Sequence, residues 1–81
     1  MNLKYSLVIE ATDDPDFFGF HSPDLEGFSG VGQSIEDCLT KADLGIDEHL
    51  KLLAEAGIPI PPINPNPTVV VHNSERIVPA A

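Results

Sequence analysis

Basic residues, cysteine and long apolar runs are all scarce in this chain of 81 residues. Lysine and arginine together number four against thirteen aspartates and glutamates, which gives a formal net charge of −9 at pH 7. Nucleic-acid binding draws most of its affinity from phosphate neutralisation by lysine and arginine, so we expect no direct binding to DNA or RNA. The acidity favours a basic partner instead, because opposite fields steer encounter. It is equally suited to keeping a small protein in solution.

Cysteine occurs once, at Cys38, so no disulfide can form within the chain, and no cysteine–histidine spacing indicates structural zinc. We therefore expect a reducing, cytoplasmic location. No apolar run approaches the roughly 20 residues of a membrane helix, and the N-terminus lacks a signal-peptide pattern, so we expect no membrane association. A chain this short buries little surface on folding, and oligomerisation is an ordinary way to bury more.

Three short apolar segments between residues 3 and 31 predict β-strands. Residues 3–11 alternate apolar and polar side chains, residues 17–21 form an extended aromatic segment, and residues 27–31 follow before Gly32. Turn formers at 12–16 and 22–24 separate the three segments. Short connections of this kind favour an antiparallel meander.

A long amphipathic helix is predicted after the strands. Ser34 is a suitable N-cap, and Asp37 three residues later gives a weak form of the capping box. Apolar residues then recur at spacings of three and four until Gly57 and the prolines beyond it end the pattern. A proline-rich connector over 58–67, a β-branched strand over 68–72 and a loose tail over 73–81 complete the chain. The predicted fold is α+β in the order β-β-β-α-β, one domain over residues 1–72, with the helix on one face of an antiparallel sheet.

No group of residues predicts catalysis. His21, His49 and His72 are far apart and lack metal-ligand spacing, and Cys38 falls on the apolar helix face, where a small buried hydrophobe is the better interpretation. The glycines between positions 27 and 32 lack a phosphate-binding lysine, so tight turns and close helix–strand packing explain them better. A metal-dependent nuclease would need converging carboxylates, whereas the predicted strands are mostly apolar. We expect no enzyme activity, no cofactor and no bound metal.

Two segments resemble the HicB antitoxin family of toxin–antitoxin systems. They read Pro-Asp-Leu-Glu-Gly-Phe at 23–28 and Gly-Gln-Ser-Ile-Glu-Asp-Cys-Leu at 32–39. The family typically has a Pro-Asp-Leu-Pro-Gly stretch, a glycine before a threonine or serine cap, and Glu-Glu-Ala-Leu at the helix start. The Tyr-x-x-x-Ile-Glu strand before them and the proline-rich exit are also similar, so the resemblance covers residues 3–72. Glu26 stands where the family usually has proline, and Phe28 where a small residue or cysteine is common.

The resemblance implies a partial ribonuclease-H-like domain, without nuclease activity, that binds and neutralises a small basic mRNA-cleaving toxin of the HicA kind. Many members continue into a DNA-binding domain, and since this chain stops at Ala81 we expect it to lack one. The alternative is a solitary HicB-like oligomer, a dimer or tetramer, with no toxin partner. The candidate partner-binding residues are the carboxylates near the signature segments, for which capping and turn chemistry is the competing interpretation: Asp24, Glu26, Glu36 and Asp37.

Overall fold

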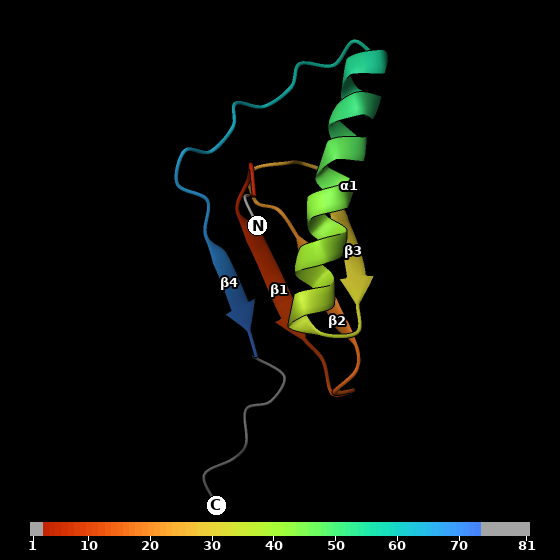
Figure 1. Ribbon diagram of the computed structural model, residues 1–81, viewed down its shortest axis with the longest axis vertical. Helices are drawn as coiled ribbons and strands as arrows, with labels where there is room; N and C mark the ends of the chain where they lie inside the picture. The colour runs from red at the N-terminus through yellow and green to blue at the C-terminus, as the bar shows by residue number, and fades with distance from the viewer. Residues whose placement is uncertain (1–2, 74–81) are drawn as a thin grey trace, which may run out of the picture.

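The computed structural model describes residues 3–73, which form one four-stranded sheet and one helix (Figure 1). The elements follow in the order β1 (Leu7–Ala11), β2 (Phe18–His21), β3 (Ser29–Gly32), α1 (Ile35–Glu55) and β4 (Val69–His72). This arrangement confirms the α+β class and the β-β-β-α-β order expected from the sequence. The predicted C-terminal tail lies, beyond Asn73, outside the described residues.

The sheet is mixed, with the strand order β3-β2-β1-β4. The first three strands form the expected antiparallel meander. Strand β4, however, pairs in parallel with β1, with Val69 opposite Leu7 and Val71 opposite Ile9. The expectation of a wholly antiparallel sheet is therefore corrected at β4. Helix α1 and the connector carry the chain from β3 at one edge to the opposite edge, and a crossover of this length lets β4 run in the same direction as β1.

Strand β1 begins at Leu7, later than the alternating pattern from residue 3 predicts. The backbone before it bonds to other segments instead, because the Lys4 carbonyl accepts the Asn64 backbone N–H at 2.9 Å. Burial nevertheless follows the predicted alternation, since Tyr5, Leu7 and Ile9 are all fully buried. The pattern therefore identified the inward face correctly and overestimated the length of the strand.

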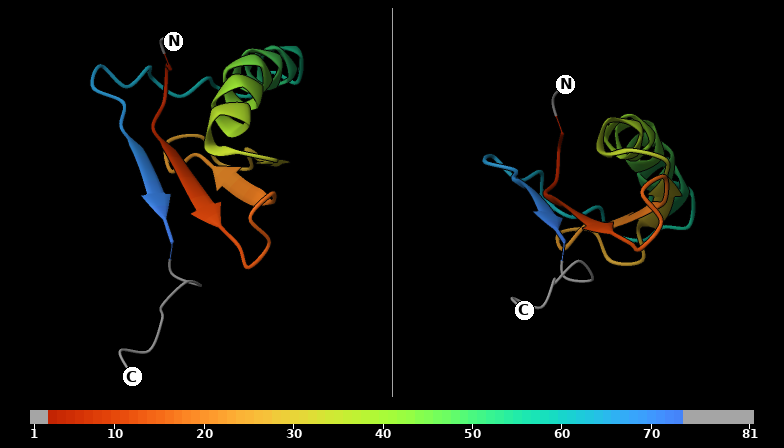
Figure 2. Two further views of the ribbon diagram at one scale, coloured as in Figure 1. Left: turned by 60° about the horizontal axis from the view of Figure 1, so that its bottom comes forward. Right: turned by 90° about the horizontal axis from the view of Figure 1, so that it is seen from below.

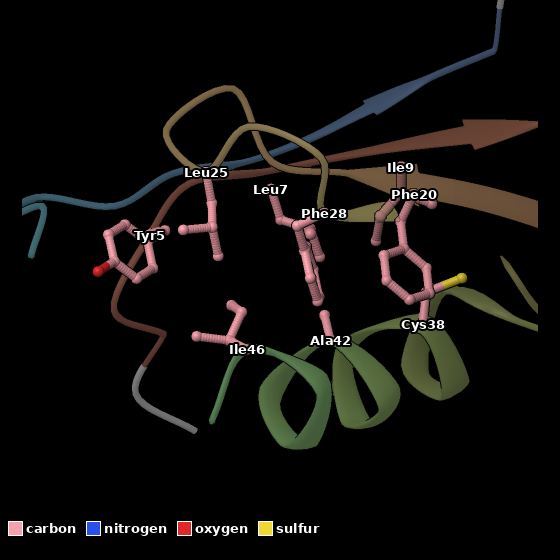
Figure 3. Packing of buried hydrophobic residues seen from close by; sticks show 9 residues of the cluster. All are labelled: Tyr5, Leu7, Ile9, Phe20, Leu25, Phe28, Cys38, Ala42 and Ile46. Atoms are coloured by element: carbon pink, nitrogen blue, oxygen red, sulfur yellow. The ribbon is translucent and has the colours of Figure 1, made fainter. Parts of the chain in front are cut away.

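The hydrophobic core lies between α1 and one face of the sheet (Figure 3). Figure 2 shows that α1 lies over the β2–β3 side of the sheet and leaves the β4 side uncovered. Cys38 is fully buried in the core, which confirms its interpretation as a small hydrophobe. The core consists of nine buried residues: Tyr5, Leu7, Ile9, Phe20, Leu25, Phe28, Cys38, Ala42 and Ile46.

Glycines allow the close packing of α1 on β2 and β3. A Cβ atom on Gly32 would lie 2.7 Å from Cys38 Sγ, closer than real contacts allow. On the helix side, a Cβ on Gly45 would lie 3.1 Å from the Phe28 ring. The contact at Gly32 confirms close helix–strand packing, and the φ of +80° at Gly27 confirms the expected role in a tight turn.

Both ends of α1 follow the signals in the sequence. Ser34 is the N-cap, and its Oγ accepts a backbone N–H three residues later. At the other end Gly57 has a φ of +72°, a conformation that glycine adopts without steric cost. The Ile58 N–H donates to the Leu53 carbonyl at 2.9 Å, and the Gly57 N–H to the Ala54 carbonyl at 3.2 Å. This is the Schellman pattern of hydrogen bonds, which satisfies the last carbonyls of the helix.

Candidate protein-interaction surfaces

Asp24, the first of the predicted contact residues, lies in the β2–β3 loop and bonds within the molecule. Its Oδ2 accepts the Asn64 side-chain amide at 3.0 Å and the Ser6 backbone N–H at 2.8 Å. These hydrogen bonds favour the ionised form and so hold the pKa of Asp24 below its usual range, and the bond from Asn64 has the largest effect. The structure thus gives Asp24 an architectural role.

Asp24 belongs to a group of hydrogen-bonded residues that we call the polar joint: Ser6, Ser22, Asp24, Asn64 and Thr68. Ser22 Oγ donates to the Ser6 carbonyl at 2.6 Å, and both serines are buried. Ser6 Oγ in turn accepts the Thr68 N–H at 3.0 Å and the Asn64 amide at 3.1 Å. The polar joint therefore connects the segment before β1, the β2–β3 loop and the end of the connector, and it places the connector at the start of β4.

Asp37 stands in the first turn of α1, where it stabilises the helix start. Its carboxylate accepts the Gln33 N–H at 2.9 Å and forms an ion pair with Lys41 Nζ at 2.9 Å. The Gln33 hydrogen bond and then Lys41 lower the pKa of Asp37. The Asp37 N–H donates to Ser34 Oγ as in a capping box, but the Asp37 carboxylate accepts the N–H of Gln33 and not that of the N-cap Ser34, so one half of the expected box is formed.

Glu26 and Glu36 are exposed, and neither forms a hydrogen bond or ion pair with the part of the chain that the structure describes. Glu26 lies beside the C-terminal end of α1, in a shallow groove with Leu53 and Ile58. Glu36 lies in the first turn of the same helix. A helix of 21 residues is roughly 30 Å long, so these carboxylates lie near opposite ends of α1. The four predicted contact residues therefore do not form one cluster.

The solvent-exposed side of α1 carries further carboxylates, which sequence reasoning did not single out as a site. Asp37 is paired with Lys41, and Asp47 with Lys4 at 2.9 Å, but the other acidic residues of α1 form no ion pair with described residues. Lys51 lies between two of them in the sequence. In the sequence these acidic residues appeared only as the polar side of the amphipathic helix, a pattern that usually indicates no more than a solvated surface. At 3.6 residues per turn they form two pairs that point to different sides of the exposed surface of α1, Glu36 with Asp43 and Glu48 with Glu55. We call these four unpaired carboxylates together the acidic helix face: Glu36, Asp43, Glu48 and Glu55.

The histidines occupy separate positions. His21 is exposed in β2, whereas His49 is partly buried and packs against the Phe28 ring with centroids 5.8 Å apart. His72 Nδ1 lies 3.8 Å from a Glu10 oxygen across β1 and β4. Within residues 3–73, no three histidine, cysteine, aspartate or glutamate side chains are grouped as metal ligands would be. No helix in the same range combines the length and apolarity needed to span a membrane.

The edge of the sheet at β4 is apolar and exposed. Val69, Val70 and Val71 are 44%, 42% and 43% exposed, because α1 covers the other side of the sheet. The connector that leads to β4 adds Ile58, Ile60 and Ile63, all exposed. This edge is the second surface that could receive a partner.

No protein-family model, curated protein or solved structure matches the chain. The likeness to the HicB family therefore rests on the sequence motifs alone. In the structure the segment at 23–28 forms the β2–β3 loop, and the segment at 32–39 ends β3 and opens α1. The two motifs thus lie at opposite ends of the sheet and serve the polar joint and the helix cap.

Proposed function

We propose that the protein is a non-catalytic binding module of the HicB antitoxin kind, which neutralises a small basic mRNA-cleaving toxin in a reducing, cytoplasmic compartment. The acidic helix face is the observation that carries this proposal. Its carboxylates form no ion pair with the described residues, on a chain with a net charge of −9. Their charge is therefore available to a cationic protein surface, which the opposite field attracts and orients.

Inhibition follows from competition for the same cationic side chains. A toxin that cleaves mRNA needs lysine and arginine to bind phosphates. A rigid helix that presents carboxylates along roughly 30 Å can occupy those side chains and exclude the RNA. Glu26 and Glu36, which the sequence singled out, are exposed and able to contact the toxin directly. Asp24 and Asp37 would act indirectly, by holding the loop and the helix start in place.

The test measures the cleavage of an mRNA substrate by a small basic toxin, ideally the product of an adjacent reading frame, with and without this protein. The variant Glu48→Gln/Glu55→Gln removes two charges from the acidic helix face. The matched control Asp13→Asn/Asp16→Asn removes two charges from the exposed β1–β2 turn, where no hydrogen bond to either side-chain carboxylate is seen among the described residues. We expect the wild-type protein to suppress cleavage and Glu48→Gln/Glu55→Gln to bind the toxin about tenfold more weakly. We expect Asp13→Asn/Asp16→Asn to lose clearly less affinity for the toxin.

Two results would contradict the proposal. The first is the absence of a complex with the toxin at low salt, where attraction between opposite charges is strongest. The second is an equal loss in both variants, which would assign the effect to total charge and not to the acidic helix face.

A second candidate function, a solitary HicB-like oligomer without a toxin, is favoured by a different observation, the apolar edge at β4. A dimer and an antitoxin are compatible, since the two surfaces lie on different elements.

A further inference from the structure

Strand β4 has a neighbour on one edge only. It pairs with β1, and no other described strand lies on its outer side (Figure 1). Edge strands in natural proteins are commonly protected from further pairing by proline, lysine or a bulge. Residues Val69–His72 contain neither proline nor lysine, and the valines are exposed on both faces of the sheet. The outer edge of β4 is therefore open to another strand.

The direction of the backbone groups in β4 follows from one hydrogen bond. The Leu7 N–H donates to the Thr68 carbonyl at 2.8 Å, so Thr68 faces β1. Backbone groups alternate in direction along a strand, so Val70 also faces β1, as its register opposite Val8 requires. The N–H and C=O groups of Val69 and Val71 therefore face outward, toward the open edge.

The charge distribution limits what can cover this edge. Residues 56–73, the connector and β4, contain no aspartate, glutamate, lysine or arginine, although such residues make up 21% of the chain. Two copies that each carry a net charge of −9 repel one another unless they meet where carboxylates are absent. The acidic residue nearest in the sheet is Glu10, and its side chain lies 3.8 Å from His72. The edge has the neutrality that a second copy of this chain requires.

We propose that two copies of the chain pair antiparallel through β4, with Val70 opposite Val70 of the second copy. In this register Val69 of each copy exchanges both of its outward backbone hydrogen bonds with Val71 of the other, so the outward groups of both valines are satisfied. Val70 forms the non-hydrogen-bonded pair on the symmetry axis, where side chains approach most closely. The result is one continuous sheet with the order β3-β2-β1-β4-β4-β1-β2-β3.

The helices stay far apart in this dimer. Helix α1 lies over β2 and β3, away from β4 (Figure 2). With neighbouring strands about 4.8 Å apart, the two helices are separated by roughly 30 Å. That distance exceeds the Debye length of about 8 Å at physiological ionic strength, so repulsion between the acidic helix faces is largely screened. Both faces remain accessible, and the dimer does not depend on the proposed toxin.

The test is sedimentation velocity of the full chain over a range of concentrations, with three variants. Val70→Lys places two like charges together on the symmetry axis, and Val71→Pro removes an outward N–H that β1 does not use. Val31→Lys is the matched control, because it makes the same change of charge at the opposite edge of the sheet. Val31 lies in β3, is 54% exposed and faces the same side of the sheet as Val70. Circular dichroism verifies that each variant retains its fold.

We expect the wild-type chain to sediment at twice its mass of 8.7 kDa. We expect Val70→Lys and Val71→Pro to raise the dissociation constant at least about tenfold, while Val31→Lys leaves it unchanged. Raising the salt from about 10 mM to physiological ionic strength should strengthen the dimer by screening repulsion, whereas it should weaken a complex with a basic toxin, so the two proposals can fail separately. A wild-type monomer at the highest concentration, or an equal effect of Val31→Lys and Val70→Lys, would overturn the inference.

Discussion

Replacing Asp24 with alanine removes the carboxylate of the polar joint. The Ser6 N–H and the Asn64 side-chain amide then lose an acceptor that each contacts at 3.0 Å or less. Hydrogen bonds to charged groups contribute about 1.5–3 kcal/mol each to the free energy of unfolding. Asp24 is partly exposed, so water replaces part of both bonds, and we expect a total loss of about 2–3 kcal/mol.

That loss is large for this chain. Proteins of this length have free energies of unfolding of about 4–12 kcal/mol, so Asp24→Ala removes a substantial fraction. The assay is urea unfolding at pH 7, followed by far-ultraviolet circular dichroism. Hydrogen exchange of the Ser6 amide adds a local readout, because its N–H loses its acceptor in the variant.

Asp24→Asn is the control, since its amide oxygen still accepts hydrogen bonds but carries no charge. We expect about half the loss of the alanine variant. The folded pKa of Asp24 lies below its unfolded value, so its contribution to stability is present above the unfolded pKa and disappears as pH falls through the folded pKa. The wild-type protein should therefore lose more stability on acidification than Asp24→Asn. Asp37, whose pKa is also lowered, keeps some pH dependence in both.

An Asp24→Ala variant within about 0.5 kcal/mol of wild type would refute this reasoning, because changes of that size are typical of surface sites without a structural role. It would mean that the three segments of the polar joint pack together without help from the carboxylate. Asp24 would then be available to contact a partner.

Three further substitutions test the helix and its packing by urea unfolding. Gly57→Ala should lower the free energy of unfolding by about 1–2 kcal/mol, because alanine is strained at a φ of +72°. An unchanged free energy of unfolding would refute the Schellman motif at the end of α1. Gly32→Ala should cost about 1–3 kcal/mol through contact with Cys38 Sγ, and adding Cys38→Ala should recover part of this loss; strict additivity would contradict the contact. Ser34→Ala should cost about 1 kcal/mol through loss of the N-cap, and a stabilised variant would show that the hydroxyl is not needed.

Features encoded by neighbouring residues could be predicted from the sequence. The helix start at Ser34 and its end at Gly57 depend on side chains and backbone angles within a few positions of each other. The alternation through Tyr5, Leu7 and Ile9 likewise identifies the buried face, because side-chain direction along an extended chain has a period of two.

Features that depend on distant segments could not be predicted in this way. Strand β4 pairs in parallel with β1, more than 60 positions away, and nothing in its run of valines specifies a direction. Asp24 bonds to Ser6 and Asn64, 18 and 40 positions away, so its internal role was not visible in the signature segment. Glu26 and Glu36 are ten positions apart in the sequence, yet the chain runs the whole length of β3 between them. Proximity in sequence therefore suggested a cluster of contacts that the fold divides between two ends.

The most direct test of the central claim, that the acidic helix face binds a basic protein, is the salt dependence of the association rate constant with the toxin. Surface plasmon resonance can measure it between about 50 mM and 500 mM salt for the wild-type protein and Glu48→Gln/Glu55→Gln. We predict a steep decrease with salt for the wild-type protein and a shallower decrease for the variant, because fewer charges steer the encounter. A rate constant that does not change with salt, or the same slope for both proteins, would contradict the claim.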